Sequence, residues 1–214
     1  MPSSAYTTFK VNLRQVDKLL EAFITMRSPT RGRKYLDHFT RAALLFLCSA
    51  WEVYIEQVAN EAGRIISTKL SKPSELPLPV KKEISSITKK SKHDLSPIEL
   101  ADDWKGYYLT QINEYTTRLN TPKKSKVLEL FNKYLGIPGD RINSAVPTLD
   151  QVNRIISVRG QVAHNVYAEE YLTKDTVDNY YQSIKQAVIE IDTLLWNYLT
   201  EITDKEPPWQ NTYN

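Results

Sequence analysis

The sequence predicts an all-α protein, a helical bundle with two long antiparallel helices. Two long segments, 34–68 and 174–202, repeat apolar residues at the three- and four-residue spacing of a helix. The chain contains only 6 glycines against 11 prolines, and few stretches alternate β-branched and polar residues as the strands of a sandwich or barrel do. With 214 residues, 41% of them apolar, we expect one compact domain over residues 1–214.

Two helices are predicted in the N-terminal part. Apolar residues from Phe9 to Ile24 keep helical spacing, and this helix should end near Met26, before the breaker sequence RSPTRG. The second helix runs from about Lys34 to Thr68, roughly 50 Å at 1.5 Å per residue. Its apolar stripe includes Phe46, Trp51 and the single cysteine, Cys48, which we expect to be buried. This helix should be the central one of the bundle.

The middle of the chain predicts shorter helices. Residues 72–79 hold three prolines and predict a loop, followed by a short polar helix over 80–90. Ser96-Pro97-Ile98-Glu99 predicts a helix start, with the helix continuing to about Leu119. Thr121-Pro122 opens another helix that stops at Gly136. An irregular turn is expected over 136–147.

The last two helices begin at capping sequences. Thr148-Leu149-Asp150-Gln151 has the pattern of a capping box, so a helix should begin at Leu149 and end near Asn165. Thr173 is expected to cap the final helix, which runs from Lys174 to Ile202.

Neither a membrane segment nor an oxidising compartment is expected. The longest apolar run, Ala42 to Trp51, is too short to span a bilayer, and the first residues lack an apolar core of signal-peptide length. One cysteine cannot form an internal disulfide. We therefore expect a cytoplasmic protein.

The positive charge is concentrated in the first half of the chain. Between Arg64 and Lys92 eight basic residues face only Glu75 and Glu83, an excess of +6. Such a segment can attract a polyanion, and Lys81, Lys82, Lys89 and Lys90 are the candidate RNA-binding residues. A solvated connection that keeps the protein soluble explains the same lysines equally well.

The segment RGQVAH, Arg159 to His164, holds the candidate catalytic pair. Arg159 falls on the apolar face of its helix, three and four residues after Ile156 and Ile155. A buried guanidinium is costly unless paired, so either Arg159 extends past the helix end to water or this face meets a partner, a cleft or an anion. His164, five residues on, lies about 140° round the helix. One chain need not bring both side chains to one point, whereas two copies about a two-fold axis can share a groove.

The segment RKYLDH, Arg33 to His38, has the same spacing but is expected at the surface. Three histidines far apart offer no zinc spacing, and no phosphate loop or nucleophile elbow is present, so we expect neither a metal nor a cofactor. Glu52 is as consistent with an exposed helix charge as with a site residue. Base stacking by tyrosines 107, 108 and 115 is weighed against packing, which we favour.

The segments LLFLCSAWEVYIEQVANEA (44–62) and SVRGQVAHN (157–165) resemble the HEPN superfamily, in particular its RiboL-PSP-HEPN group. In that family a long helix with a Trp-Glu pair comes early, and an Arg-x(4–6)-His motif precedes the final long helix. The resemblance places the core at about 9–71 and 141–203, with 72–140 less typical of the family. It implies a helical bundle that dimerises with its two motifs facing each other.

The resemblance also implies a metal-independent endoribonuclease. Arg159 and His164 would be catalytic, with Glu52, Ser157, Gln161 and Asn165 as candidate supporting residues. Partners implied are RNA, a second copy of the chain, and an antitoxin or a defence-system protein. The family commonly has Asn, Asp or His directly after the arginine, and here the residue is Gly160. The alternatives are a catalytically silent HEPN dimer that binds RNA or protein, and a helical adaptor with no nucleic-acid role.

Overall fold

The computed structural model describes residues 2–26, 36–91, 96–164, 172–203, 208–210 and 212–213, with only the backbone of His164. Over these residues the fold is all-α, as predicted, and contains no strand. In chain order the elements are α1 (Ser4–Met26), α2 (Asp37–Lys69), the 3-10 turn η1 (Pro73–Glu75), α3 (Leu78–Lys90), α4 (Ser96–Asp102), α5 (Trp104–Thr116), α6 (Lys124–Leu130), the π-helical η2 (Phe131–Leu135), α7 (Gly139–Ala145), α8 (Leu149–His164) and α9 (Lys174–Thr203).

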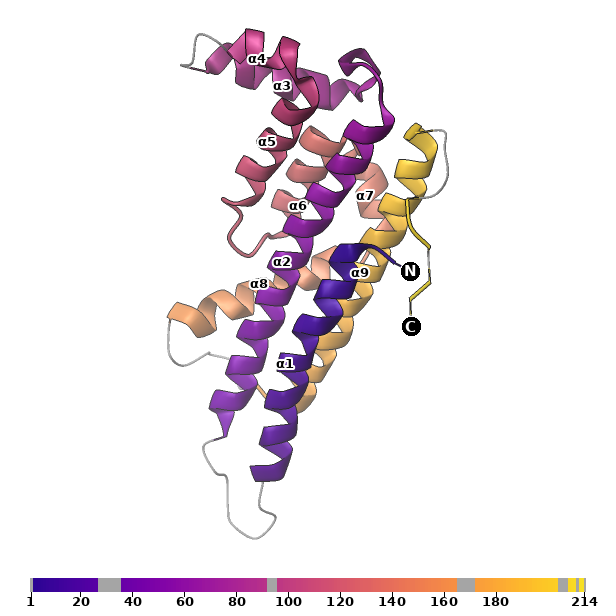
Figure 1. Cartoon of the computed structure of the whole chain (residues 1–214). Helices are drawn as coiled ribbons and strands as arrows, with labels where there is room; N and C mark the ends of the chain where they lie inside the picture. Colours follow the sequence, from indigo (N-terminus) through magenta and orange to yellow (C-terminus); the bar gives the residue numbers. More distant parts are fainter. Residues whose placement is uncertain are drawn as a thin grey trace.

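Three long helices, α1, α2 and α9, form the bundle (Figure 1). The two long helices that we predicted to be antiparallel, α2 and α9, are not an antiparallel pair; instead, α1 runs antiparallel to both of them (Figure 1). The ring of Phe9 packs against Tyr54 with centroids 5.8 Å apart, while the amide of Ala5 donates to Glu61 at 3.0 Å. By contrast, α2 and α9 run in the same direction (Figure 1), because the segments from α3 to α8 carry the chain back along α2 before α9 begins.

The core is built around α2. Among the described residues it is the helix long and apolar enough to cross a membrane by length and composition. In this fold its apolar side chains face α1, α5, α8 and α9, and Leu47, Cys48, Trp51 and Val58 are fully buried. Burial within the bundle therefore accounts for its hydropathy. Phe46, which we predicted on the core-facing stripe, is instead 51% exposed.

The middle of the chain contains more helix than predicted. The proline-rich segment 72–79 includes η1 and the first residues of α3, because Pro79 occupies a position near the helix start where no amide donor is needed. The helix expected over 96–119 is divided at Asp103, whose side chain accepts from the amide of Gly106 at 2.9 Å and so begins α5. The expected turn over 136–147 contains α7, which begins directly after Pro138.

The predicted helix boundaries near the end of the chain are confirmed. The α8 helix begins at Leu149, and α9 begins at Lys174 with Thr173 Oγ1 accepting from the amide of Thr176 at 3.0 Å. The predicted stop at Gly136 is confirmed as well, since Gly136 ends η2 with a φ of 83°. Asn165 and the breaker segment 27–32 lie outside the described residues.

Candidate functional site

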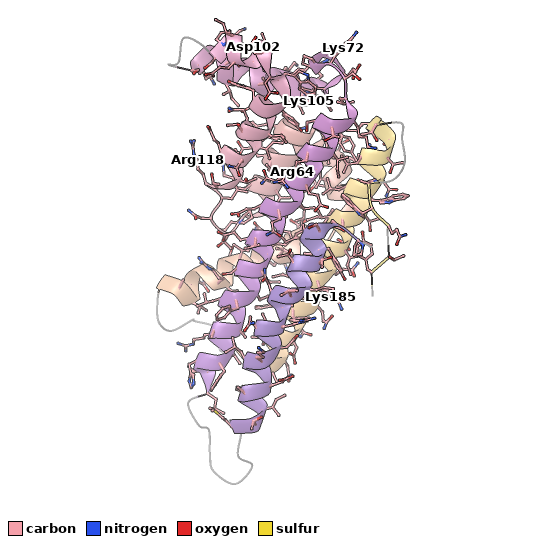
Figure 2. The ribbon with its side chains drawn as sticks, in the orientation of Figure 1. Arg64, Lys72, Asp102, Lys105, Arg118 and Lys185 are labelled. Carbon is pink, nitrogen blue, oxygen red and sulfur yellow. The ribbon has the colours of Figure 1, made fainter. Side chains whose placement is uncertain are left out.

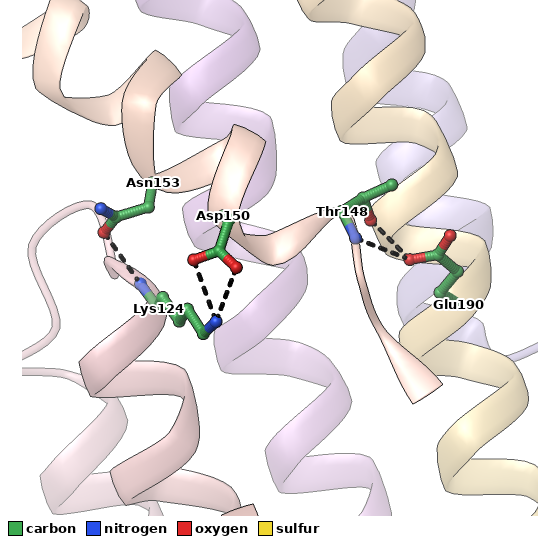
Figure 3. A network of polar contacts seen from close by, with 5 residues as sticks. All are labelled: Lys124, Thr148, Asp150, Asn153 and Glu190. Atoms are coloured by element: carbon green, nitrogen blue, oxygen red, sulfur yellow. Dashed lines mark hydrogen bonds and ion pairs between the residues drawn. The ribbon is translucent and has the colours of Figure 1, made fainter. Parts of the chain in front are cut away.

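The first half of α8 is held in place by the hydrophobic core, by α6 and by α9. Its residues Leu149, Val152, Ile155 and Ile156 are buried in the core. Figure 3 shows the polar contacts around its start: Lys124 Nζ lies 2.9 Å from the Asp150 carboxylate, and the Lys124 amide donates to Asn153 Oδ1 at 3.4 Å. These contacts fix α8 against α6.

A second anchor joins the start of α8 to α9. Thr148 Oγ1 donates to Glu190 Oε2 at 2.5 Å (Figure 3). Beyond these anchors the C-terminal half of α8 extends away from the three-helix bundle (Figure 1). The helix segment that carries Arg159 and His164 is therefore held at one end and presented at the edge of the molecule.

Arg159 lies between α8 and α2. Its side chain is partly buried, and its Nε is buried without a hydrogen-bond partner among the described residues. The charge of Arg159 acts on Cys48: burial raises the pKa of this thiol to about 12, the guanidinium opposes the rise, and the Glu52 carboxylate adds to it. An unsatisfied donor on a cation of this kind favours an anionic ligand or acceptor from outside the chain.

His164 is the last residue of α8, and its side chain lies outside the described residues, as does Asn165. Helix geometry separates the Cα positions of Arg159 and His164 by about 7.5 Å along the axis and about 140° around it. Between them, Gly160 faces open space, with no atom within 4 Å of where a Cβ would stand. The surroundings of α8 thus leave room for a larger side chain at this position.

Glu52 has a role that its sequence position did not predict. It accepts two hydrogen bonds, from the amide of Thr121 at 2.6 Å and from its hydroxyl at 2.8 Å. Thr121 has a φ of 44°, a left-handed conformation that is rare for a β-branched residue. The neighbouring Trp51, buried as expected, donates from Nε1 to Pro122 O at 3.0 Å. Glu52 and Trp51 together hold the turn that precedes α6.

Two further candidate supporting residues, Ser157 and Gln161, lie on the solvent-facing side of α8. Both are exposed, and Ser157 Oγ donates to Asn153 O at 3.0 Å within the same helix. With the exposed Arg154 they form a polar strip along α8. Ala163, directly before His164, is exposed as well.

The predicted RNA-binding lysines are not beside Arg159. Lys81, Lys82 and Lys89 line one shallow depression of about 460 Å³ on α3, while Lys90 lines a separate groove of about 1330 Å³ between α3 and α5. The α3 helix lies beyond the Lys69 end of α2 (Figure 1), whereas Arg159 is near enough to Cys48 for its charge to lower the pKa of that thiol. At 1.5 Å per residue, 21 residues of α2 separate these levels by about 30 Å. Within one chain this segment does not fold over α8.

The three tyrosines considered for base stacking divide into two kinds. Tyr108 is fully buried and donates to Tyr134 O at 2.7 Å, so it packs the core. Tyr107 and Tyr115 are partly buried and line neighbouring grooves along α5.

His38, from the second segment with Arg-His spacing (RKYLDH), lies in the first turn of α2, at the end opposite to α3 (Figure 1). It is exposed, next to the ion pair of Arg41 with Asp37 at 2.7 Å, and Arg33 lies outside the described residues. Over the part of the chain that is described, no three His, Cys, Asp or Glu side chains gather as a metal site would require.

The structure places a basic turn against α8 that we did not predict from the sequence. The stretch from Tyr115 to Leu128 contains Arg118, Lys123, Lys124 and Lys126 and no carboxylate. A run of this length without an acidic residue is a detectable signal, but its charge is smaller than the +6 excess between Arg64 and Lys92.

The family model for RiboL-PSP-HEPN matches residues 11–197. No curated protein and no solved structure matches the chain.

Proposed function

Because the chain belongs to the RiboL-PSP-HEPN family, which indicates a nuclease or an RNA-binding module, we propose that it is a metal-independent endoribonuclease of the toxin-antitoxin or antiviral-defence type. The observation that carries the proposal is Arg159. Its Nε is buried and without a partner among the described residues, on the helix that directly precedes the last long helix. This is where the family has its arginine.

The proposed reaction is cleavage of RNA by its own ribose. The 2′-oxygen attacks the adjacent phosphorus, the bond from phosphorus to the 5′-oxygen breaks, and the products carry a 2′,3′-cyclic phosphate and a 5′-hydroxyl. His164 serves as general base or acid for the proton moved in this step. Arg159 stabilises the charge on the phosphorane.

The site is proposed to lie at a homodimer interface. Arg159 lies on the apolar side of α8, where its charge reaches Cys48 of α2, and His164 occupies a helix position about 140° away. Two chains related by a two-fold axis therefore complete the site more readily than one. The lysines of α3 serve as distant phosphate contacts for RNA long enough to reach them.

The test compares two histidine variants. His164→Ala should abolish RNA cleavage measured in the presence of a chelator. His38→Ala changes the exposed histidine of the RKYLDH segment and should leave cleavage nearly intact. Both variants should keep wild-type helicity. DNA of the same sequence should not be cut, because it lacks the 2′-hydroxyl. Equal losses in the two variants would contradict the assignment of the motif.

A catalytically silent RNA-binding dimer is the second candidate, and Gly160 favours it. The position is open to a larger side chain, yet the polar residue common in the family is missing. This function predicts RNA binding without cleavage by the wild-type chain.

Growth of cells that express the chain tests the toxin proposal. If the chain is a toxin, its expression should arrest growth, and His164→Ala should relieve the arrest.

A further inference from the structure

The turn that precedes α6 and the start of α8 form one surface. The Lys124 amide donates to Asn153 Oδ1 at 3.4 Å, and the Lys124 ammonium lies 2.9 Å from Asp150. Residues 115–128 and 151–164 are therefore adjacent at this point. Together they carry six cations and no carboxylate: Arg118, Lys123, Lys124, Lys126, Arg154 and Arg159.

Not all of these cations are available to a ligand. Lys124 is paired with Asp150, and Lys126 lies 2.9 Å from Glu129. Lys123 and Arg154 are exposed and have no ion-pair partner among the described residues. Arg118 lies 3.9 Å from Glu114, with its side chain 81% exposed, and an exposed pair of this kind holds its partner weakly.

The backbone that presents Lys123 is fixed before any ligand arrives. Glu52 binds the amide and hydroxyl of Thr121, and Trp51 binds the carbonyl of Pro122. The Lys124 amide is bound on the other side by Asn153. A contact surface ordered in advance loses less conformational entropy on binding.

The surface leads toward the candidate catalytic pair. Arg154, Ser157 and Gln161 are all exposed on one side of α8, which ends at His164. From Asp150 to His164 the helix extends about 20 Å, comparable to about six stacked nucleotides at 3.4 Å each. Figure 2 places Arg118 at the same edge of the molecule as the end of α8.

We propose that Lys123, Arg154 and Arg118 bind phosphates of the single-stranded RNA that flanks the cleaved bond, and that the Trp51–Glu52 pair holds the turn in place. This inference rests on the proposed function. It assigns the nearest phosphate contacts to this turn, not to the lysines of α3. Single-stranded RNA fits because its phosphates can follow a row of separated cations.

The test measures RNA binding by the full chain carrying His164→Ala, so that RNA stays intact. The probe is a labelled single-stranded RNA of about 20 nucleotides, titrated at several salt concentrations. Adding Arg118→Glu, Lys123→Glu and Arg154→Glu should lower affinity by one to two orders of magnitude. The slope of log affinity against log salt should fall by about two, since each single-strand contact contributes roughly 0.7.

The matched control reverses three exposed cations on α1: Lys10→Glu, Arg14→Glu and Lys18→Glu. It makes the same change in net charge, so it reports the effect of overall charge alone. Lys123→Gln by itself is the mild variant, expected to reduce the slope by about 0.7 without altering helicity.

The outcomes separate the two proposals. Loss of affinity in the first triple variant well beyond that of the α1 control supports the inference. Equal effects of the two triple variants, or an unchanged slope for Lys123→Gln, overturn the inference while the proposed function stands. If the His164→Ala chain itself binds no RNA at low salt, RNA as the partner is wrong, and the proposed function fails with it.

Discussion

At the scale of single residues, Glu52 is the position where a catalytic and a structural role can be separated. Its carboxylate accepts both donors of Thr121, at 2.6 and 2.8 Å, so its hydrogen-bonding capacity is engaged in holding a turn. A group committed in this way is poorly suited to transfer a proton. The position on α2 could not reveal this, because the partner lies 69 residues further along the chain.

Glu52→Ala and Glu52→Gln should therefore differ. The alanine leaves two donors of Thr121 without their acceptor and should lower the free energy of unfolding by about 2 kcal/mol, whereas glutamine keeps one acceptor oxygen and should cost about half as much. Cleavage should follow stability, with the glutamine variant retaining most of it. Glu56→Ala, one turn further along α2, controls for loss of charge. A stable Glu52→Gln variant without cleavage would show that the carboxylate takes part in the chemistry.

At the scale of helices, the sequence predicts those features that depend on neighbouring residues, such as helix starts and apolar faces. The start of α9 follows from Thr173, whose hydroxyl caps the helix a few residues away. The apolar stripe of α8 and its interruption at Arg159 follow from spacing alone. The direction of α9 relative to α2 depends instead on how the helices from α3 to α8 pack, through contacts such as Tyr198 Oη to Leu135 O at 2.8 Å. Such contacts between distant segments leave no periodic signature.

Gly160 and Gly136 lie in opposite environments, and the same substitution at each should change stability in opposite directions. Gly160 lies inside α8, where an added Cβ meets nothing within 4 Å. Gly136 ends η2 with a φ of 83°, and an added Cβ would stand 2.3 Å from Pro77 Cβ. Gly160→Ala should stabilise the protein by about 0.5–1 kcal/mol through helix propensity. Gly136→Ala should destabilise it by more than about 1 kcal/mol through backbone strain and overlap.

Chemical unfolding of the two variants and the wild type, monitored by circular dichroism, gives both values. The same substitution is made twice, so the change in composition cancels and only the environment differs. Destabilisation by Gly160→Ala would mean that α8 needs a glycine there for a reason outside this chain, such as close approach of a second copy. Stabilisation by Gly136→Ala would contradict the left-handed turn.

At the scale of the whole molecule, the arrangement of α2, α8 and α9 determines how a site can be assembled. The end of α8 lies at the edge of the bundle, with Arg159 turned toward Cys48 of α2 and His164 at a position facing a different direction. In the proposed homodimer, a second chain related by a two-fold axis would bring its own α8 next to that of the first chain. Arg159 of one chain would then stand beside His164 of the other.

Mixing two inactive chains tests this arrangement. Arg159→Ala and His164→Ala homodimers should each fail to cleave RNA. After subunit exchange at equal amounts, about half of the dimers are mixed, and each mixed dimer pairs the intact Arg159 of one chain with the intact His164 of the other. Cleavage should return to a fraction of the wild-type rate, limited by the share of mixed dimers. The double variant mixed with wild type provides the control, because its mixed dimers hold an arginine and a histidine only on one chain. Failure of the complementary mixture, with exchange confirmed by mass spectrometry, would place both catalytic groups in a single chain.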